Sequence, residues 1–184
     1  ADAVYFAVDT LNMRARARNF DVASLGKVVE YCHGHGVKTH LTLNTIVYQD
    51  ELEKMRHIVE RAKSAGVDMV ICWDMSVIAA CNQTGMPFCV STQASISNAA
   101  AANAYQALGA QRVVLARECS LAQITDICQR SDVEIECFVH GAMCIAISGR
   151  CLLSQDIYGK SGNRGECLQP CRRHYHVRDE EDEA

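Results

Sequence analysis

Four cysteines near the end of the sequence are spaced like the ligands of a metal site. Cys144, Cys151, Cys167 and Cys171 are separated by six, fifteen and three residues. Structural zinc sites usually pair ligands roughly two to four residues apart on both sides, and only Cys167 and Cys171 form such a pair. The spacing favours an iron–sulfur cluster, with zinc as the alternative and unligated or catalytic thiols as a third interpretation. Glycines near these cysteines would let the backbone wrap closely around a cluster: Gly141, Gly149, Gly159, Gly162 and Gly165.

The other seven of the eleven cysteines stand singly within apolar runs. The odd total and the lack of a secretory leader favour a reducing compartment, where clustered cysteines are more often metal ligands than disulfides. We therefore expect a cytoplasmic protein. No apolar stretch approaches the roughly 20 residues of a membrane span, so no membrane contact is expected. We interpret the seven as small buried hydrophobic residues: Cys32, Cys72, Cys81, Cys89, Cys119, Cys128 and Cys137.

The region that contains the cysteines is locally basic, although the formal net charge of −4 gives no global sign of nucleic-acid binding. A basic loop at 150–178 beside a metal site would suit an anionic partner such as an RNA backbone, with Tyr158, His174 and Tyr175 available to stack on bases. An ordinary solvated loop is the alternative. Residues 179–184 are expected to form an acidic tail. The basic residues are Arg150, Lys160, Arg164, Arg172, Arg173 and Arg178, against Asp156 and Glu166.

The rest of the sequence alternates short apolar runs with longer amphipathic ones, which is typical of an α/β fold. The spacing is regular and lacks a Gly-rich dinucleotide-binding motif, so it favours a partial (β/α)8 TIM-type barrel at 1–143 over a doubly wound sheet. Six strands do not close an eight-stranded barrel, so we expect further βα units outside this sequence. The predicted strands are 3–8, 37–43, 69–73, 88–91, 112–116 and 133–139, and the predicted helices are 22–35, 50–64, 76–83, 96–108 and 121–129.

Polar residues follow the predicted strands, where barrel enzymes place their active sites. Candidate substrate-binding and catalytic residues are Arg14, Arg16, Arg18, Gln93, Arg117 and His140, and the polar residues Asn44, Thr45, Asp74, Thr92 and Glu118 also follow strands. Loops that are polar only because they are solvated are the alternative for any one residue. His140 suits a general acid or base, a hydrogen-bond donor to a cluster, or a capped loop histidine.

One stretch resembles the signature of the peptidase U32 family, the collagenase-like proteases. It runs Glu136-x-Phe138-x-x-Gly141-Ala142-Met143-Cys144-x4-Gly149-x-Cys151-x-Leu153-Ser154. Further matches are the opening ADAVYF, the NT of 44–45, the STQAS of 91–95, the LARE of 115–118 and the GNRGECLQPCR of 162–172. The resemblance spans nearly the whole sequence.

The resemblance implies an oxygen-independent hydroxylase that acts on transfer RNA, ribosomal RNA or a ubiquinone precursor. It implies a [4Fe–4S] cluster on Cys144, Cys151 and Cys167. Cys171 matches a cysteine of the RNA-acting branch, and prephenate is implied as the oxygen donor. We therefore expect a cluster-binding segment at 144–178 that packs on the barrel of an RNA-base hydroxylase.

Two other functions are alternatives. One is a collagenase-like peptidase, although the sequence has neither an HExxH helix nor a GxSxG elbow. A cysteine protease built on Cys144 and His140 is conceivable, but nothing in the sequence activates that thiol. The other is a non-catalytic RNA-binding module with a structural zinc.

Overall fold

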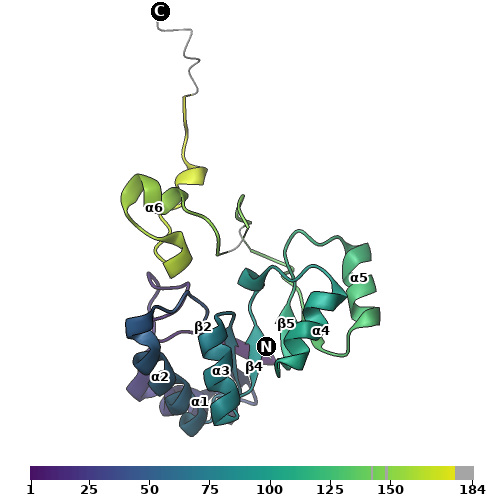
Figure 1. Ribbon diagram of the computed structural model, residues 1–184. Coiled ribbons are helices and arrows are strands. Elements are labelled where there is room, and N and C mark those ends of the chain that lie inside the picture. The colour runs from purple at the N-terminus through teal and green to yellow at the C-terminus, as the bar shows by residue number, and fades with distance from the viewer. Residues whose placement is uncertain (142, 148, 177–184) are drawn as a thin grey trace, which may run out of the picture.

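The computed structural model describes residues 1–141, 143–147 and 149–176 and contains one parallel six-stranded sheet in the order β1-β2-β3-β4-β5-β6. A doubly wound sheet reverses its strand order at a switch point, so the consecutive order excludes that alternative. The sheet curls into a half-barrel, which confirms the predicted partial barrel (Figure 1). The strands are β1 (Ala3–Phe6), β2 (Lys38–Leu43), β3 (Met69–Cys72), β4 (Phe88–Val90), β5 (Arg112–Val114) and β6 (Glu134–Glu136).

Five helices connect consecutive strands and cover the outer face of the sheet (Figure 1). They are α1 (Leu25–Gly34), α2 (Leu52–Ala65), α3 (Met75–Thr84), α4 (Ala99–Ala107) and α5 (Leu121–Arg130). The short helix α6 (Leu153–Tyr158) belongs to the predicted cluster-binding segment at 144–178, which we call the cysteine segment. Within the described residues, no helix has both the length and the apolarity needed to cross a bilayer.

The helix predicted at 96–108 begins three residues later than the periodicity suggested. Asn98 caps α4, because its side chain accepts a hydrogen bond from the Ala101 amide at 2.9 Å. Ile96 instead forms a parallel bridge with Leu115 and therefore extends the sheet. Its apolar side chain fits both elements, so periodicity alone could not assign it.

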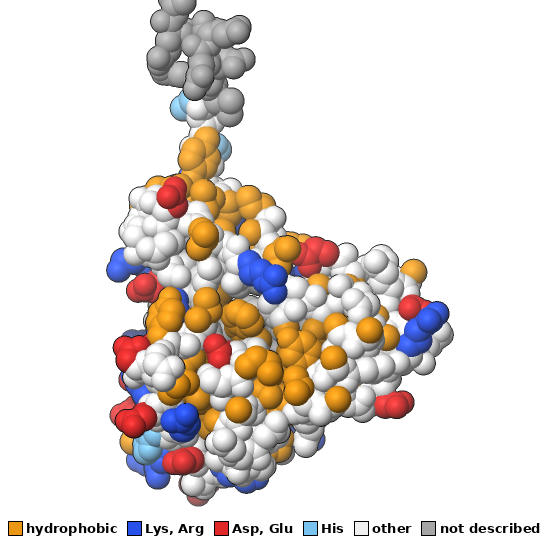
Figure 2. Space-filling model, viewed as in Figure 1, with side chains coloured by type: hydrophobic (Ala, Val, Ile, Leu, Met, Phe, Trp, Pro, Cys, Tyr) orange, Lys and Arg blue, Asp and Glu red, His pale blue; other side chains and the backbone are white. Residues whose placement is uncertain are grey.

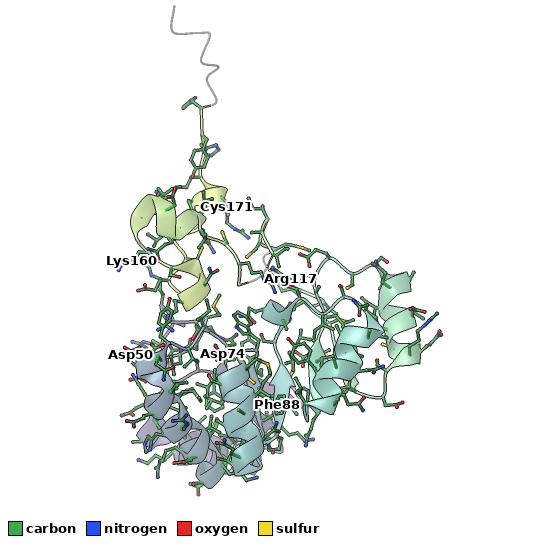
Figure 3. The ribbon with its side chains drawn as sticks, in the orientation of Figure 1. Asp50, Asp74, Phe88, Arg117, Lys160 and Cys171 are labelled. Carbon is green, nitrogen blue, oxygen red and sulfur yellow. The ribbon has the colours of Figure 1, made fainter. Side chains whose placement is uncertain are left out.

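The main core lies between the outer face of the sheet and the helices, around fully buried side chains such as Leu41, Val70 and Phe88. A smaller cluster of Met69, Cys89 and Val114 lies on the inner, concave face. Figure 3 labels Phe88 within the body of the half-barrel. The concave face therefore carries one small apolar cluster, contributed by β3, β4 and β5.

The prediction for the seven single cysteines is correct for three of them and wrong for one. Cys72, Cys81 and Cys89 are buried. A hydrogen bond with Cys81, together with burial, raises the pKa of the Cys72 thiol well above its ordinary value of 9.0, so this thiol stays neutral. Cys128 is exposed, because it lies next to Ile127, the α5 residue that is buried against the sheet. The half-buried remainder are Cys32, Cys119 and Cys137.

A charged group lies on the concave face beside the apolar cluster, because Arg112 is in register with Cys89 and Glu136 with Val114. Arg112 donates to Glu134 at 2.9 Å and to Glu136 at 3.1 Å. His40 is buried close to this group, and its pKa lies below the ordinary 6.5, chiefly because burial disfavours the charged ring and secondarily because Arg112 is near. Protonation of His40 therefore opposes folding.

The buried histidine predicts a loss of stability in acid. A folded-state pKa below 6.5 means that the contribution of neutral His40 is fully present above pH 6.5 and falls as the pH drops below it. The slope from this one group is at most about 1.4 kcal/mol per pH unit. Urea unfolding of wild type and His40→Gln between pH 5 and 7 measures it. The variant should lose most of that slope, whereas exposed His57→Gln should keep it. Equal slopes in all three proteins would contradict the prediction.

Candidate active site at the carboxyl edge of the half-barrel

The loops after β1 to β4 are joined around Asn44, directly after β2. The side-chain oxygen of Asn44 accepts a hydrogen bond from the Met13 amide at 3.0 Å. The backbone carbonyl of Asn44 accepts from Trp73 Nε1 at 2.9 Å and from Gln93 Nε2 at 3.3 Å. Gln93 is buried and its side-chain oxygen accepts a hydrogen bond from the Ser91 hydroxyl. The predicted site residue Gln93 is therefore held in place from two sides.

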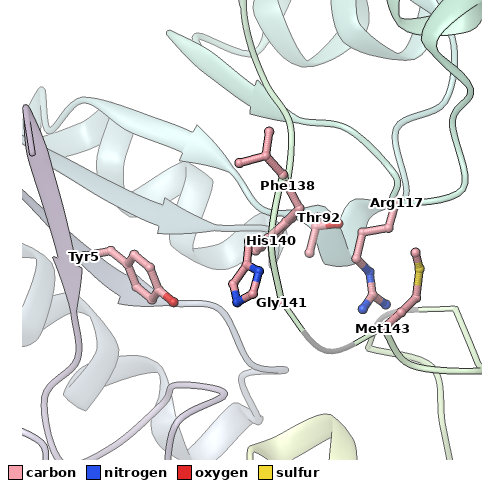
Figure 4. A pocket seen from close by; sticks show the side chains of 8 residues that line it. Tyr5, Thr92, Arg117, Phe138, His140, Gly141 and Met143 are labelled. Carbon is pink, nitrogen blue, oxygen red and sulfur yellow. The ribbon is translucent and has the colours of Figure 1, made fainter.

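Arg117 and His140 come together at one cavity, as the side chains that follow β5 and β6. The cavity has a volume of about 460 Å³. Figure 4 shows the Tyr5 ring directed from β1 toward His140, and the Arg117 side chain on the other side of the segment through Gly141. The walls combine cationic, aromatic and hydroxyl groups, which suit a polar or anionic small molecule. The lining residues are Tyr5, Thr92, Arg117, Phe138, Val139, His140, Gly141 and Met143.

The three arginines predicted after the first strand differ in position. All three are exposed. Arg14 lines a second cavity of about 220 Å³ on the concave face, and its guanidinium carbon lies 5.4 Å from the centre of the Tyr5 ring. Arg16 and Arg18 line neither cavity. Asp74 has a structural role, because it caps α3 through the Ser76 amide at 2.9 Å and also accepts from the Val47 amide at 3.0 Å.

The four predicted metal ligands belong to the C-terminal part of the chain, and Figure 3 shows Cys171 outside the body of the half-barrel. Cys151 is half-buried, and Cys144, Cys167 and Cys171 are exposed. A side chain at Gly162 would contact both Cys167 and the Cys151 carbonyl, and Arg172, next to Cys171, donates to the carbonyl of Met143, next to Cys144, at 3.2 Å. These contacts bring the stretches that carry the four cysteines near one another.

The thiols are not assembled into a finished site. Among residues 1–141, 143–147 and 149–176, no three Cys, His, Asp or Glu side chains converge closely enough to hold a metal. The chemistry of the donor set does fit a cluster: four thiols near glycines, with the Gln169 amide donating to the Cys167 sulfur at 3.3 Å. Binding would have to draw the four thiols together, as is common where metal binding and folding are coupled.

The cysteine segment is attached to the half-barrel by a clamp, which we define as Arg164 with Glu51, Tyr48 and the Ile46 carbonyl. Arg164 binds Glu51 through both terminal nitrogens, one of them at 2.8 Å, and also donates to the Ile46 carbonyl. Its guanidinium carbon lies 4.7 Å from the centre of the Tyr48 ring. The hydrogen bond from Arg164 holds the pKa of Glu51 below its ordinary 4.5. The clamp is therefore charged at neutral pH.

Two glycines allow the cysteine segment to pack closely against the loops of the half-barrel. Gly165 has a φ of +82°, and a Cβ there would lie 2.4 Å from the Asn12 carbonyl oxygen. Gly149 has a φ of +72°, and a Cβ there would lie 3.0 Å from the Gln93 side chain. Only glycine permits both the left-handed backbone and this approach. The cysteine segment therefore contacts the loops that carry Arg14 and Gln93.

Breaking the clamp should loosen the cysteine segment. Arg164→Ala removes a partly buried bidentate ion pair, and we expect the free energy of opening of residues 160–173 to fall by about 2–3 kcal/mol, measured by amide hydrogen exchange. Arg150→Ala, a change of an exposed arginine in the same segment, is the matched control. The contribution of Glu51 should disappear as the pH falls through its lowered pKa. Unchanged protection of 160–173 in Arg164→Ala would show that the clamp does not hold the segment.

The predicted basic loop is only partly available to a partner. Arg164 is committed to the clamp, Lys160 lies 3.9 Å from Glu166, and Arg173 lies over the Tyr158 ring at 4.9 Å. On the face in Figure 2, Lys and Arg side chains are dispersed and form no continuous basic surface. Arg178 and the predicted acidic tail at 179–184 fall outside the described residues.

The sequence interpretation missed Tyr5 and Phe138, which line both cavities. Tyr5 is 56% exposed although it lies in the middle of a strand. Two-residue alternation along 3–6 was an available signal, because it places Tyr5 on the face opposite Phe6 of the core.

A parallel half-barrel with polar side chains converging at the carboxyl edge has the architecture of a (β/α)-barrel enzyme. The model of "Peptidase family U32" matches residues 1–184, and an uncharacterized protease of Methanocaldococcus jannaschii is 43% identical over 94% of this chain and 44% of its own length. The chain belongs to the peptidase U32 family.

The relatives differ in their named activities. A 23S rRNA 5-hydroxycytidine synthase of Escherichia coli is 37% identical over 98% of this chain and 27% of its own length. Other relatives are named collagenase and tRNA hydroxylation protein. The chain spans less than half the length of these relatives. A solved U32 peptidase structure covers 74% of this chain and 60% of its own with a TM-score of 0.59 at 16% identity, which establishes the shared fold.

Proposed function

We propose that this chain is part of an enzyme that hydroxylates a base in transfer or ribosomal RNA. The observation that carries the proposal is the convergence of Arg117 and His140 on one cavity, which is also lined by Met143, the neighbour of Cys144. Relatives named for rRNA and tRNA hydroxylation support the choice of substrate.

The two side chains have complementary roles in this proposal. Arg117 binds the anionic group of a small oxygen-donating metabolite, for which the family resemblance suggests prephenate, because a guanidinium matches a carboxylate in shape and charge. His140, on the same cavity, moves a proton to or from the reacting molecule, since imidazole both donates and accepts near neutral pH. Phe138 and Val139 supply apolar surface on the same cavity.

Cys144, Cys151, Cys167 and Cys171 would hold the cluster in this proposal. A bound [4Fe–4S] cluster supplies one-electron redox chemistry that side chains lack. The clamp and the two close-packed glycines then fix the cysteine segment over the cavity.

The test is nucleoside mass spectrometry of RNA from cells that lack their own RNA hydroxylases and express this chain, with and without its four cysteines. A nucleoside heavier by one oxygen atom, present only with the intact chain, supports the proposal. Cleavage of denatured collagen by purified metal-free chain, with no RNA change, would support a peptidase. One tightly bound zinc and RNA binding without turnover would support the non-catalytic module.

A further inference from the structure

The concave face of the half-barrel holds a second cavity, which lies deeper than the one at Arg117 and His140. It has a volume of about 220 Å³, below the range of roughly 300–1,000 Å³ that is usual for drug-sized ligands. Ile71 and Val114 belong both to its lining and to the apolar cluster with Met69 and Cys89. The cavity is therefore small and partly apolar, and it suits one flat ring.

Two aromatic side chains stand where this cavity meets the larger one. Tyr5 from β1 and Phe138, which follows β6, line both cavities. They come from the two opposite edges of the sheet, so a ring that enters between them meets aromatic surface on the way in. Base–aromatic stacking tolerates any base, because every base has a π-face.

The polar groups of the cavity add selectivity. Glu136 lines it and is held by Arg112 at 3.1 Å, so its carboxylate is oriented and can only accept hydrogen bonds. A carboxylate accepts from the amino group of cytosine and equally from a ring N–H. Arg14 lines the same cavity at the Tyr5 ring, where a guanidinium can bind the phosphate of the nucleotide.

We propose that this cavity receives a single pyrimidine base flipped out of single-stranded RNA, with Tyr5 as the stacking platform and Glu136 as the acceptor for an N–H of the base. The inference rests on the proposed RNA function and deepens it, because it separates a base pocket from the donor pocket at Arg117 and His140. Enzymes that act on a base take it from single-stranded nucleic acid or extrude it from a duplex. The wall that Tyr5, Thr92 and Phe138 share would place the base beside the oxygen donor.

The test uses two fluorescein-labelled single-stranded RNA 9-mers that are identical except at the centre, where one carries cytidine and the other an abasic site. Fluorescence anisotropy with the 184-residue chain should give tighter binding of the cytidine RNA. Tyr5→Ala should weaken that binding about 5- to 100-fold and leave the abasic RNA unchanged. Tyr5→Phe should retain the preference, and Glu136→Gln should lower it about tenfold.

Tyr31→Ala is the matched control, because Tyr31 is an exposed tyrosine of α1 that lines neither cavity. Circular dichroism checks that Tyr5→Ala is folded. Equal affinity of wild type for the two RNAs, or an unchanged preference in Tyr5→Ala, would overturn the base pocket and leave RNA as the substrate. No binding of either RNA by wild type would overturn the proposed function and the base pocket with it.

Discussion

Cys144→Ala protein, purified and reconstituted without oxygen, is expected to lose nearly all of the iron, sulfide and visible absorbance that the wild type holds at about four irons and four sulfides per chain. Cys144 is one of four thiols on a segment whose separate stretches contact one another, at Gly162 and through the Arg172–Met143 hydrogen bond. Removing one thiolate leaves an iron without its protein ligand. Metal and sulfide analysis with an absorption spectrum measures the effect.

Cys128→Ala is the matched control, because Cys128 is also exposed but lies on α5, outside the cysteine segment. It should keep the full cluster. A colourless wild type that holds one zinc, with the zinc lost in Cys144→Ala and kept in Cys128→Ala, would show that the cysteines bind zinc and not a cluster. Wild type that binds no metal after reconstitution would end the metal-site hypothesis.

Alanine at both His140 and Arg117 is expected to lower RNA hydroxylation by about 100-fold or more, since a positioned acid–base group alone contributes roughly that much. Both side chains line the same cavity and neither belongs to the buried core, so the folded structure should survive. The measurement is the fraction of hydroxylated nucleoside in cellular RNA, by mass spectrometry. Near-normal hydroxylation in the double variant would show that the reaction needs neither His140 nor Arg117.

Two further variants separate the roles. Arg117→Lys keeps the charge but loses the planar fork, so it should show a weaker apparent affinity for the oxygen donor with a smaller loss of maximal rate. His57→Ala removes an exposed histidine of α2, outside the cavity, and should behave as wild type.

The central strands β3 and β4 could be predicted from the sequence because buried parallel strands form apolar runs whatever follows them. Arg117 and His140 could be placed at one edge of the sheet, because each follows a predicted strand and the carboxyl ends of parallel strands meet at the same edge. The exposure of Cys128 could not be predicted, since a helix in which every third or fourth residue is apolar leaves the neighbouring position undecided. Nor could the Arg164–Glu51 pair, whose partners lie 113 residues apart and share no local pattern.

The consecutive strand order has a consequence for how the protein is made. Register partners are separated by 18 residues for Val70 and Phe88 and by 35 residues for Ala3 and Lys38, so each new strand finds its neighbour within the stretch most recently synthesised. Contacts this local favour rapid folding, and the half-barrel can grow one βα unit at a time as the chain leaves the ribosome. The clamp depends on Glu51, which is synthesised long before Arg164. Docking of the cysteine segment therefore follows the synthesis of the half-barrel unit that carries Glu51.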